Sequence, residues 1–108
     1  ETHEGVTTTE YVAIDHLGLT PPCQSVQAVE DGYIDRGGRC PVNMSGGLRG
    51  AGHPGGATGV RMVLDGARQV TGHADAMQIP DARRMQTLNI GGSFGTVVSF
   101  VVESGKGA

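Results

Sequence analysis

Several features that define common protein classes are missing from this sequence. It has no tryptophan, and only 4% of its residues are aromatic. Lysine and arginine total 8 against 11 acidic residues, and Arg83-Arg84 is the longest basic run. This balance, with a net charge of −3, excludes the positive surface that nucleic-acid binding requires. The sequence also lacks an apolar run long enough to span a bilayer and a signal-peptide pattern at its start.

Cysteine is scarce as well. Cys23 and Cys40 are the only two, and they do not form a C-x-x-C motif. We therefore expect two reduced thiols and a cytoplasmic location. The four histidines form no i/i+4 pair and no His/Cys cluster with ligand spacing, so no metal site is predicted.

Glycine, in contrast, is abundant, with 19 of 108 residues, and it gathers between strongly patterned segments. Such clusters indicate tight backbone turns at a site. The length corresponds to one domain or part of one. Because the sequence opens on Glu1 rather than Met, we interpret residues 1–108 as a single domain and as a fragment of a longer chain.

Two short helices are expected in the first third of the chain. The first covers residues 7–17, with Thr7 as N-cap and Glu10 closing a capping box. The second follows Ser25 as its cap, runs through Glu30 and ends at Gly32. Residues 33–39 are expected to form an irregular or weakly extended connection.

The most regular helical pattern follows the glycine-rich region. Its apolar residues recur at i, i+3, i+4, i+7 and i+10 and form one stripe: Val60, Val63, Leu64, Ala67 and Val70. Gly72 is a natural end for this helix.

Two β-rich runs close the sequence, at residues 85–90 and 96–103. The glycine-bearing residues 91–95 between them favour an antiparallel hairpin. The second run is apolar on both faces and is therefore expected to be a buried central strand. Helices combined with strands predict a layered α/β architecture.

The sharpest local feature is residues 52–59, Gly-His-Pro-Gly-Gly-Ala-Thr-Gly, which lead directly into the regular helix. A neutral His53 at a helix N-terminus can donate its ring N–H to a developing oxyanion. The alternative is a turn histidine without a role. Gly50, Gly52 and Gly55 also match G-x-G-x-x-G, but Pro54 and the lack of a preceding strand argue against a dinucleotide site.

Three blocks together give the sequence a family resemblance. Residues 43–47, Asn-Met-Ser-Gly-Gly, and residues 52–59 resemble the thiolase signature N-x-x-G-G followed by G-H-P-x-G-A-x-G. Residues 1–7 and the following 11–18 resemble the E-x-H-D-C-F-T region of sterol-carrier-protein-type thiolases, and residues 89–93 match the C-terminal C-x-G-G block. The chain is identified as a C-terminal half of the thiolase superfamily, of the sterol-carrier-protein or acetyl-CoA acetyltransferase type.

The resemblance implies a βαβαββ fold with layers α-β-α that ends in the hairpin. It also implies an acyl-CoA substrate, a coenzyme A thioester, with no permanently bound cofactor. A cytoplasmic homodimer of lipid metabolism is implied, whose N-terminal thiolase half carries the nucleophilic cysteine. Some such enzymes work with a small OB-fold/zinc-ribbon partner protein.

By the same resemblance, His53 lines an oxyanion hole for the thioester carbonyl. His3 stands where other thiolases place an asparagine that orients a water in the same hole, and a histidine at this position could donate there directly. Gly52, Gly92 and Ser45 are expected to lie against the thioester, with Gly92 near the second oxyanion hole. Asn89 stands where ordinary thiolases carry the second, acid–base cysteine, and it cannot transfer a proton at neutral pH.

The cysteine of the sterol-carrier type is also missing, because its position is Gly5. The groups left for proton transfer are His53, His3, Glu4 or a residue of the N-terminal half. Three functions therefore remain open. They are a thiolase-like acyltransferase, a thiolase-like aldolase acting on CoA-linked side chains, and a non-catalytic thiolase-like binding subunit. The loss of both cysteines favours the aldolase over ordinary thiolysis.

Overall fold

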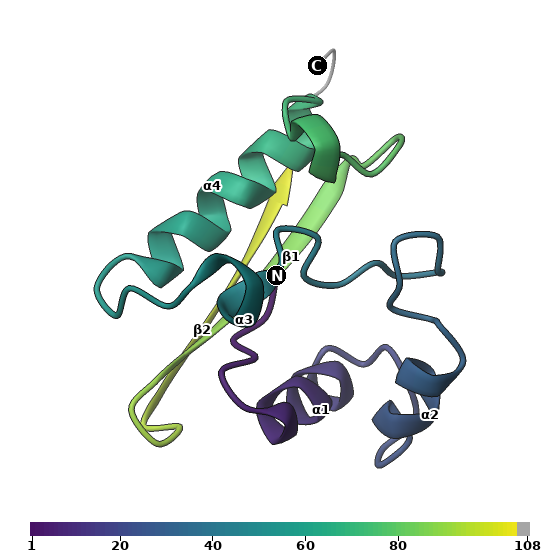
Figure 1. Ribbon diagram of the computed structural model, residues 1–108, viewed down its shortest axis with the longest axis vertical. Helices are drawn as coiled ribbons and strands as arrows, with labels where there is room; N and C mark the ends of the chain where they lie inside the picture. Colours follow the sequence, from purple (N-terminus) through teal and green to yellow (C-terminus); the bar gives the residue numbers. More distant parts are fainter. Residues whose placement is uncertain (106–108) are drawn as a thin grey trace.

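A computed structural model describes residues 1–105 as a small α/β domain (Figure 1). Its elements, in chain order, are α1 (Thr7–His16), α2 (Ser25–Glu30), α3 (Gly47–Ala51), α4 (Thr58–Thr71), the 3₁₀ helix η1 (Asp75–Met77), β1 (Arg84–Gly91) and β2 (Thr96–Glu103). The last three residues of the predicted domain, 106–108, lie outside this description.

The C-terminal hairpin is confirmed. β1 pairs with β2 in antiparallel register, with Thr87 opposite Phe100 and Gly91 opposite Thr96. The turn between the strands uses positive φ angles at Gly92 (60°) and Phe94 (64°). These angles reverse the chain in the four residues that separate the paired ends.

The expectation that the second strand is buried and central is wrong for the described residues. Within residues 1–105, β2 pairs only with β1 and forms the outer edge of the sheet. Phe100 is 55% exposed and Val101 59% exposed. An apolar pattern on both faces indicates a strand that can be buried on both faces. The described residues do not supply a layer that buries both faces of β2.

The other edge of β1 is occupied by the first residues of the chain. Thr2 forms a parallel bridge with Leu88. The Leu88 amide donates to the Glu1 carbonyl at 2.9 Å, and the terminal amine of Glu1 donates to the Gln86 carbonyl at 3.0 Å. The first strand of the expected βαβαββ order is thus reduced to one bridge residue.

No second strand forms between the helices in the described part of the chain. Residues 33–42 close on themselves instead, because the Cys40 amide donates to the Tyr33 carbonyl at 3.0 Å and the Val42 amide donates to the Ile34 carbonyl at 2.9 Å. These local bonds use backbone groups that a sheet would otherwise require. The segment at 33–39 is irregular, as predicted.

The predicted central helix is confirmed as α4, which ends at Gly72 in the left-handed conformation (φ 77°). However, the predicted apolar stripe is buried only toward its end, where Val70 is 7% exposed. Val60 is 73% exposed, whereas Met62 is fully buried. A Cβ on Gly66 would lie 3.2 Å from Val102 Cγ2, so this glycine lets α4 approach β2 closely.

The helix caps near the N-terminus differ from those expected. The N-cap of α1 is Val6, whose backbone is extended, and Thr9 Oγ1 donates to the Val6 carbonyl at 2.6 Å. The capping box from Thr7 to Glu10 is therefore wrong, because the helix starts one residue earlier than expected. Similarly, α2 begins after Gln24, and Ser25 is its first buried residue rather than its cap.

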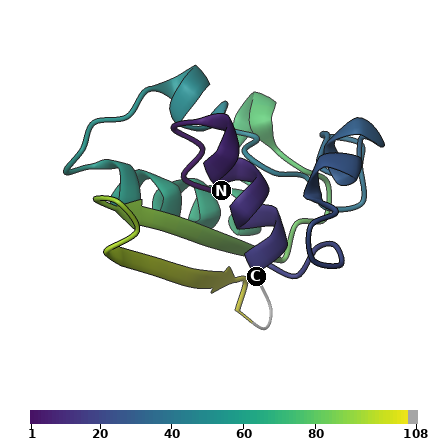
Figure 2. The same cartoon turned by 90° about the horizontal axis from the view of Figure 1, so that it is seen from below.

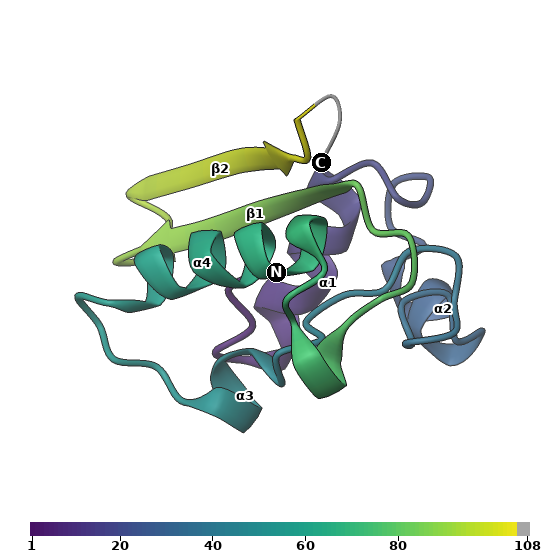
Figure 3. The same cartoon turned by 90° about the horizontal axis from the view of Figure 1, so that it is seen from above.

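α4 runs along the hairpin and packs on both of its strands, whereas α1 packs against α2 (Figures 2 and 3). Buried apolar residues come from all parts of the chain, namely Ala13, Ile14, Ala28, Ile34, Leu48, Met62, Val70, Ala74, Leu88 and Ile90. No helix within residues 1–105 is long and apolar enough to cross a membrane.

Candidate active site

Two histidines from distant parts of the chain meet in space. The rings of His3 and His53 lie with their centroids 4.8 Å apart and their planes at 81°. His3 directly follows the bridge residue Thr2, whereas His53 belongs to the loop between α3 and α4. The loop turns at Gly52, whose φ of 92° favours glycine. The fold therefore joins the two candidate residues into one cluster.

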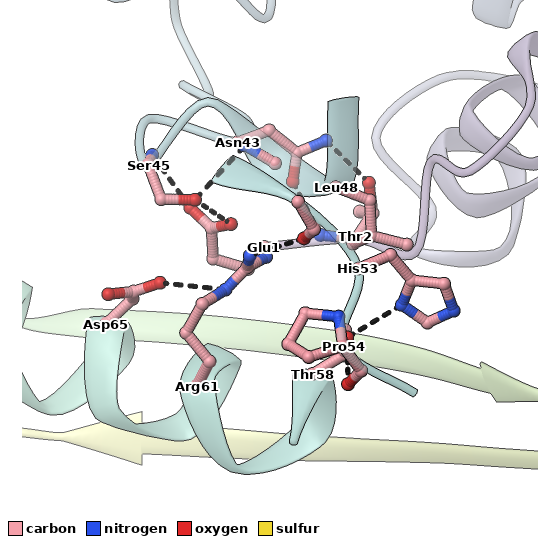
Figure 4. Close-up of polar contacts among 12 residues, drawn as sticks. Glu1, Thr2, Asn43, Ser45, Leu48, His53, Pro54, Thr58, Arg61 and Asp65 are labelled. Atoms are coloured by element: carbon pink, nitrogen blue, oxygen red, sulfur yellow. Dashed lines mark hydrogen bonds and ion pairs between the residues drawn. The ribbon is translucent and has the colours of Figure 1, made fainter. Parts of the chain in front are cut away.

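The first residue of α4 holds His53. Thr58 Oγ1 lies 2.7 Å from His53 Nδ1 and 3.1 Å from the Pro54 carbonyl oxygen (Figure 4). Thr58 is fully buried, whereas His53 is exposed. A hydroxyl can either donate or accept. The hydroxyl has one hydrogen, so when Thr58 gives it to Nδ1 rather than to the Pro54 carbonyl, the neutral His53 ring keeps its own hydrogen on Nε2 and can donate from there.

His3 has a different partner. Its Nδ1 lies 2.7 Å from Oδ1 of Asn89, which projects from β1. A carbonyl oxygen only accepts, so His3 Nδ1 carries the hydrogen and donates it. In the neutral ring, His3 Nε2 is then left with a free lone pair. The two rings therefore differ. His3 is held with Nε2 as an acceptor, whereas His53 donates from Nε2 in the tautomer in which Thr58 donates to its Nδ1.

The other predicted site residues do not all join this cluster. Gly52 lies next to His53 in the chain, and its carbonyl accepts a 2.8 Å hydrogen bond from Arg61 Nη1. Ser45 instead donates to the Glu1 carboxylate at 2.6 Å and so holds the first residue of the chain in place (Figure 4). Gly92 lies in the hairpin turn beyond Asn89.

Glu4 is bonded to α3 rather than to the histidine pair. Glu4 is 5% exposed, and its carboxylate accepts a hydrogen bond from the Leu48 amide at the start of α3. Gly47 leaves the space for this carboxylate, since a Cβ there would overlap it. Glu4 therefore acts in the structure as the residue that joins the N-terminal segment to α3.

Sequence reasoning missed two polar residues on α4 behind the loop. Arg61 Nε lies 3.7 Å from Asp65 Oδ2, and Asp65 is 8% exposed. Burial raises the pKa of the Asp65 carboxyl, and Arg61 partly opposes the shift. The i, i+4 spacing of an arginine and an aspartate was the available signal. It does not reveal that Arg61 also holds the Gly52 carbonyl.

Neither imidazole lies in the cavity at the opposite end of β1. That cavity has a volume of about 410 Å³ and is lined by Met85 and Gln86 together with residues from segments 39–44 and 79–84. Cys40 also lines it, and burial raises the pKa of the Cys40 thiol. Within residues 1–105 there is no cluster of three or more potential metal ligands.

Comparison with known proteins covers nearly the whole chain. Residues 1–104 match the family described as thiolase C-terminal domain-like. The chain is 38% identical over 96 residues to acetyl-CoA acetyltransferase of Methanothermobacter thermautotrophicus, covering 89% of this chain and 25% of that protein. It is 37% identical over 95 residues to human sterol carrier protein 2, covering 86% of this chain and 17% of that protein.

A further relative is the benzoylsuccinyl-CoA thiolase subunit BbsB of Thauera aromatica. It is 28% identical over 92 residues, which cover 85% of this chain and 24% of that protein. The chain therefore spans a quarter or less of the length of these three curated relatives. The match over residues 1–104 shows that this chain belongs to the thiolase family, as a C-terminal domain.

Proposed function

We propose that the chain is the C-terminal part of a thiolase-like acyl-CoA acyltransferase of the acetyl-CoA acetyltransferase type. It supplies His3 and His53 for carbon–carbon bond formation or cleavage on CoA thioesters. The observation that carries this proposal is the contact of the two imidazoles, 4.8 Å apart, with each Nδ1 held by its own partner. The family match and the similarity to an acetyl-CoA acetyltransferase support it.

The proposed reaction requires the site to stabilise negative charge on a thioester oxygen. In the tautomer whose Nδ1 accepts from Thr58, His53 carries its hydrogen on Nε2 and donates it to that oxygen. Such a donor is effective because it is fixed before charge develops. Gly52 contributes by setting the loop, which Arg61 holds through the Gly52 carbonyl.

The nucleophile belongs to another part of the enzyme under this proposal. Cys23 is exposed, and its amide donates to Asp15 Oδ2. Cys40 lies in the cavity at the opposite end of β1, and its raised pKa disfavours the thiolate that a nucleophile needs. An N-terminal thiolase half would provide the cysteine and complete the pocket around the imidazoles. The small fraction of the relatives' length that this chain spans supports a nucleophile located outside it.

The proposed complete enzyme is a cytoplasmic homodimer of lipid metabolism. The apolar exposed surface of β2 and the exposed Val60 of α4 support a covering partner layer. The CoA thioester is a substrate rather than a resident cofactor. Ser45 and Gly92 would act on it indirectly, Ser45 through Glu1 and Gly92 through the hairpin turn.

A second candidate function is a thiolase-like aldolase that acts on a CoA-linked side chain. Asn89 and Gly5 favour it, because a retro-aldol step needs no second cysteine. An OB-fold/zinc-ribbon protein would be its partner. A third candidate is a binding subunit without catalytic activity, in which the histidine pair has only a structural role.

Calorimetry with acetyl-CoA separates catalytic and binding roles. The chain should be titrated alone and together with an N-terminal thiolase half. Binding only in the complex supports a catalytic half, and binding in neither case favours the non-catalytic subunit. The complete enzyme should then be assayed for acyl transfer to CoA and for aldehyde or ketone release from a β-hydroxyacyl-CoA. Acyl transfer supports the proposal, and release alone supports the aldolase.

His53→Ala in the complete enzyme tests the role of the donor. Loss of one oxyanion donor should lower turnover about 10²–10³-fold. His73→Ala is the matched control, because His73 is exposed and, within residues 1–105, its ring has a hydrogen-bond partner only in Thr71 Oγ1 at 3.2 Å. Turnover that is unchanged in His53→Ala contradicts the assignment.

A further inference from the structure

Asn89 presents a chemical problem, because an amide cannot transfer a proton, yet it lies within the histidine cluster. It projects from β1 between two buried residues of the opposite face, Leu88 and Ile90. Its Oδ1 is 2.7 Å from His3 Nδ1. The side chain is thus aimed at the imidazole rather than at solvent.

The structure also leaves space for the Asn89 amide. A Cβ on Gly59, in the first turn of α4, would lie 2.8 Å from Asn89 Nδ2. That distance is shorter than side chains tolerate, so the glycine makes room for the amide at this point. α4 and β1 therefore together determine where Asn89 Oδ1 lies.

The two histidines are constrained to different degrees. The Thr58 hydroxyl beside His53 can donate or accept, so it permits either tautomer of that ring. The Asn89 carbonyl oxygen permits only the tautomer of neutral His3 that carries hydrogen on Nδ1. His3 is also half-buried, whereas His53 is exposed. His3 is the ring whose Nε2 lone pair is fixed in advance.

We propose that Asn89 is a positioning residue that holds His3 Nε2 as the proton-transfer atom of the site. This inference rests on the proposed acyl-CoA function and adds the group that moves the proton. His3 Nε2 takes a proton from the α-carbon of the thioester. The Cα–H bond breaks, an Nε2–H bond forms, and the electron pair stays on the substrate as an enolate. In the cleavage direction, the protonated His3 returns this proton to the enolate carbon.

The division of labour between the rings follows from their partners. His53 donates to the enolate oxygen while His3 exchanges the proton at carbon. The edge-to-face contact of the rings places both near one small substrate group. The histidine pair then supplies the acid–base group that Asn89 and Gly5 cannot supply.

Nitrogen-15 NMR of the labelled chain tests the positioning step directly. Long-range nitrogen–proton spectra should show the neutral His3 ring with its hydrogen on Nδ1. Asn89→Leu removes the acceptor and should shift His3 to the Nε2–H form that free histidine favours. Asn89→Asp keeps an acceptor oxygen and should retain the Nδ1–H form. A His3 tautomer that is the same in Asn89→Leu and the unsubstituted chain overturns the positioning role.

Exchange of the α-protons of acetyl-CoA into D₂O by the complete enzyme tests the proton-transfer step. His3→Asn can still donate an N–H but cannot carry a proton, so exchange should fall about 10²–10⁴-fold. Asn89→Leu should reduce the exchange rate with little change in KM, since a wrong histidine tautomer alone can cost up to about 10⁴-fold. Adding Asn89→Cys to His3→Asn should restore part of the exchange, because a thiol can transfer the proton.

The outcomes separate the two proposals. An unsubstituted enzyme that neither exchanges α-protons nor transfers acyl groups overturns the acyltransferase function, and this inference with it. An active enzyme whose exchange survives His3→Asn overturns this inference alone and leaves His3 as an oxyanion donor. Loss of exchange in His3→Asn, with rescue by Asn89→Cys, supports both.

Discussion

Thr58 Oγ1 lies 2.7 Å from His53 Nδ1, so the first residue of α4 holds an imidazole from the loop that precedes it. The same hydroxyl lies 3.1 Å from the Pro54 carbonyl oxygen. One buried side chain thus links the helix start, the turn at Pro54 and the exposed ring. A glycine-rich loop would otherwise have little to fix a side chain in one orientation.

Substitution at Thr58 should therefore affect stability and the His53 ring together. Thr58→Val has the same shape but removes the fully buried hydroxyl that contacts His53 Nδ1 and the Pro54 carbonyl, so we expect a loss of about 1–3 kcal/mol in the free energy of unfolding. Thr58→Ser keeps the hydroxyl and should lose only about 0.8 kcal/mol for its missing methyl group. Urea unfolding measures the difference. Equal losses in the two variants contradict the importance of the hydroxyl.

Gly59→Ala should perturb the site even though alanine is the better helix former. The gain in helix propensity is about 1 kcal/mol, but the new Cβ meets Asn89 Nδ2 at 2.8 Å and must displace the amide. The His3 tautomer signal in nitrogen-15 NMR should change as a result. Gly50→Ala is the matched control, because it lies in α3 and its Cβ would meet no atom within 4 Å. A His3 signal that is unchanged in Gly59→Ala contradicts the packing of Gly59 on Asn89.

Much of the fold follows from local pattern, but not the elements that depend on distant contacts. Apolar periodicity and Gly72 predict α4, and the glycine-bearing turn predicts the hairpin. The helix α3 escapes prediction, because Gly47–Ala51 has poor helix propensity. It forms where the Glu4 carboxylate accepts from the Leu48 amide, a contact between residues far apart in sequence.

The candidate site likewise combines a residue that local sequence predicts with contacts that local sequence does not predict. The glycines around His53 and the helix after them mark that residue from local sequence alone. The meeting of His53 with His3 could be expected only from the family resemblance, since no periodicity connects the two positions. The partners Thr58 and Asn89 required the coordinates, because their bonds depend on how the loop and β1 lie against α4.

Asp65 should make the native chain less stable as its carboxyl ionises. Burial raises its pKa above the ordinary 3.8, so the folded chain binds this proton more tightly than the unfolded chain does. The stabilising contribution is complete below pH 3.8 and is lost as the pH rises through the folded-state value. Asp65→Asn should therefore weaken the decline of the unfolding free energy above pH 3.8.

Unfolding of Asp65→Asn measured at a series of pH values checks this prediction. Asp81→Asn is the charge-matched control, because Asp81 is exposed and lies in a connecting loop. Its curve should follow that of the unsubstituted chain. If Asp65→Asn and the unsubstituted chain decline in parallel above pH 3.8, the ion pair with Arg61 outweighs the burial of the carboxyl.

The exposed outer strand should make the chain associate with itself. Val97 and Val101 are 48% and 59% exposed on one face of β2. Within residues 1–105, one backbone edge of this strand pairs with β1, and no strand pairs with the other edge. An apolar edge strand pairs readily with another chain, and a lysine placed on it opposes that pairing. Val101→Lys should therefore shift the chain toward monomer in sedimentation velocity, with a larger shift when Val97→Lys is added. Val6→Lys is the control, because Val6 is 58% exposed but precedes α1 and lies away from the strand. A monomer fraction that rises equally in Val6→Lys would show that net charge, rather than the edge of β2, governs association.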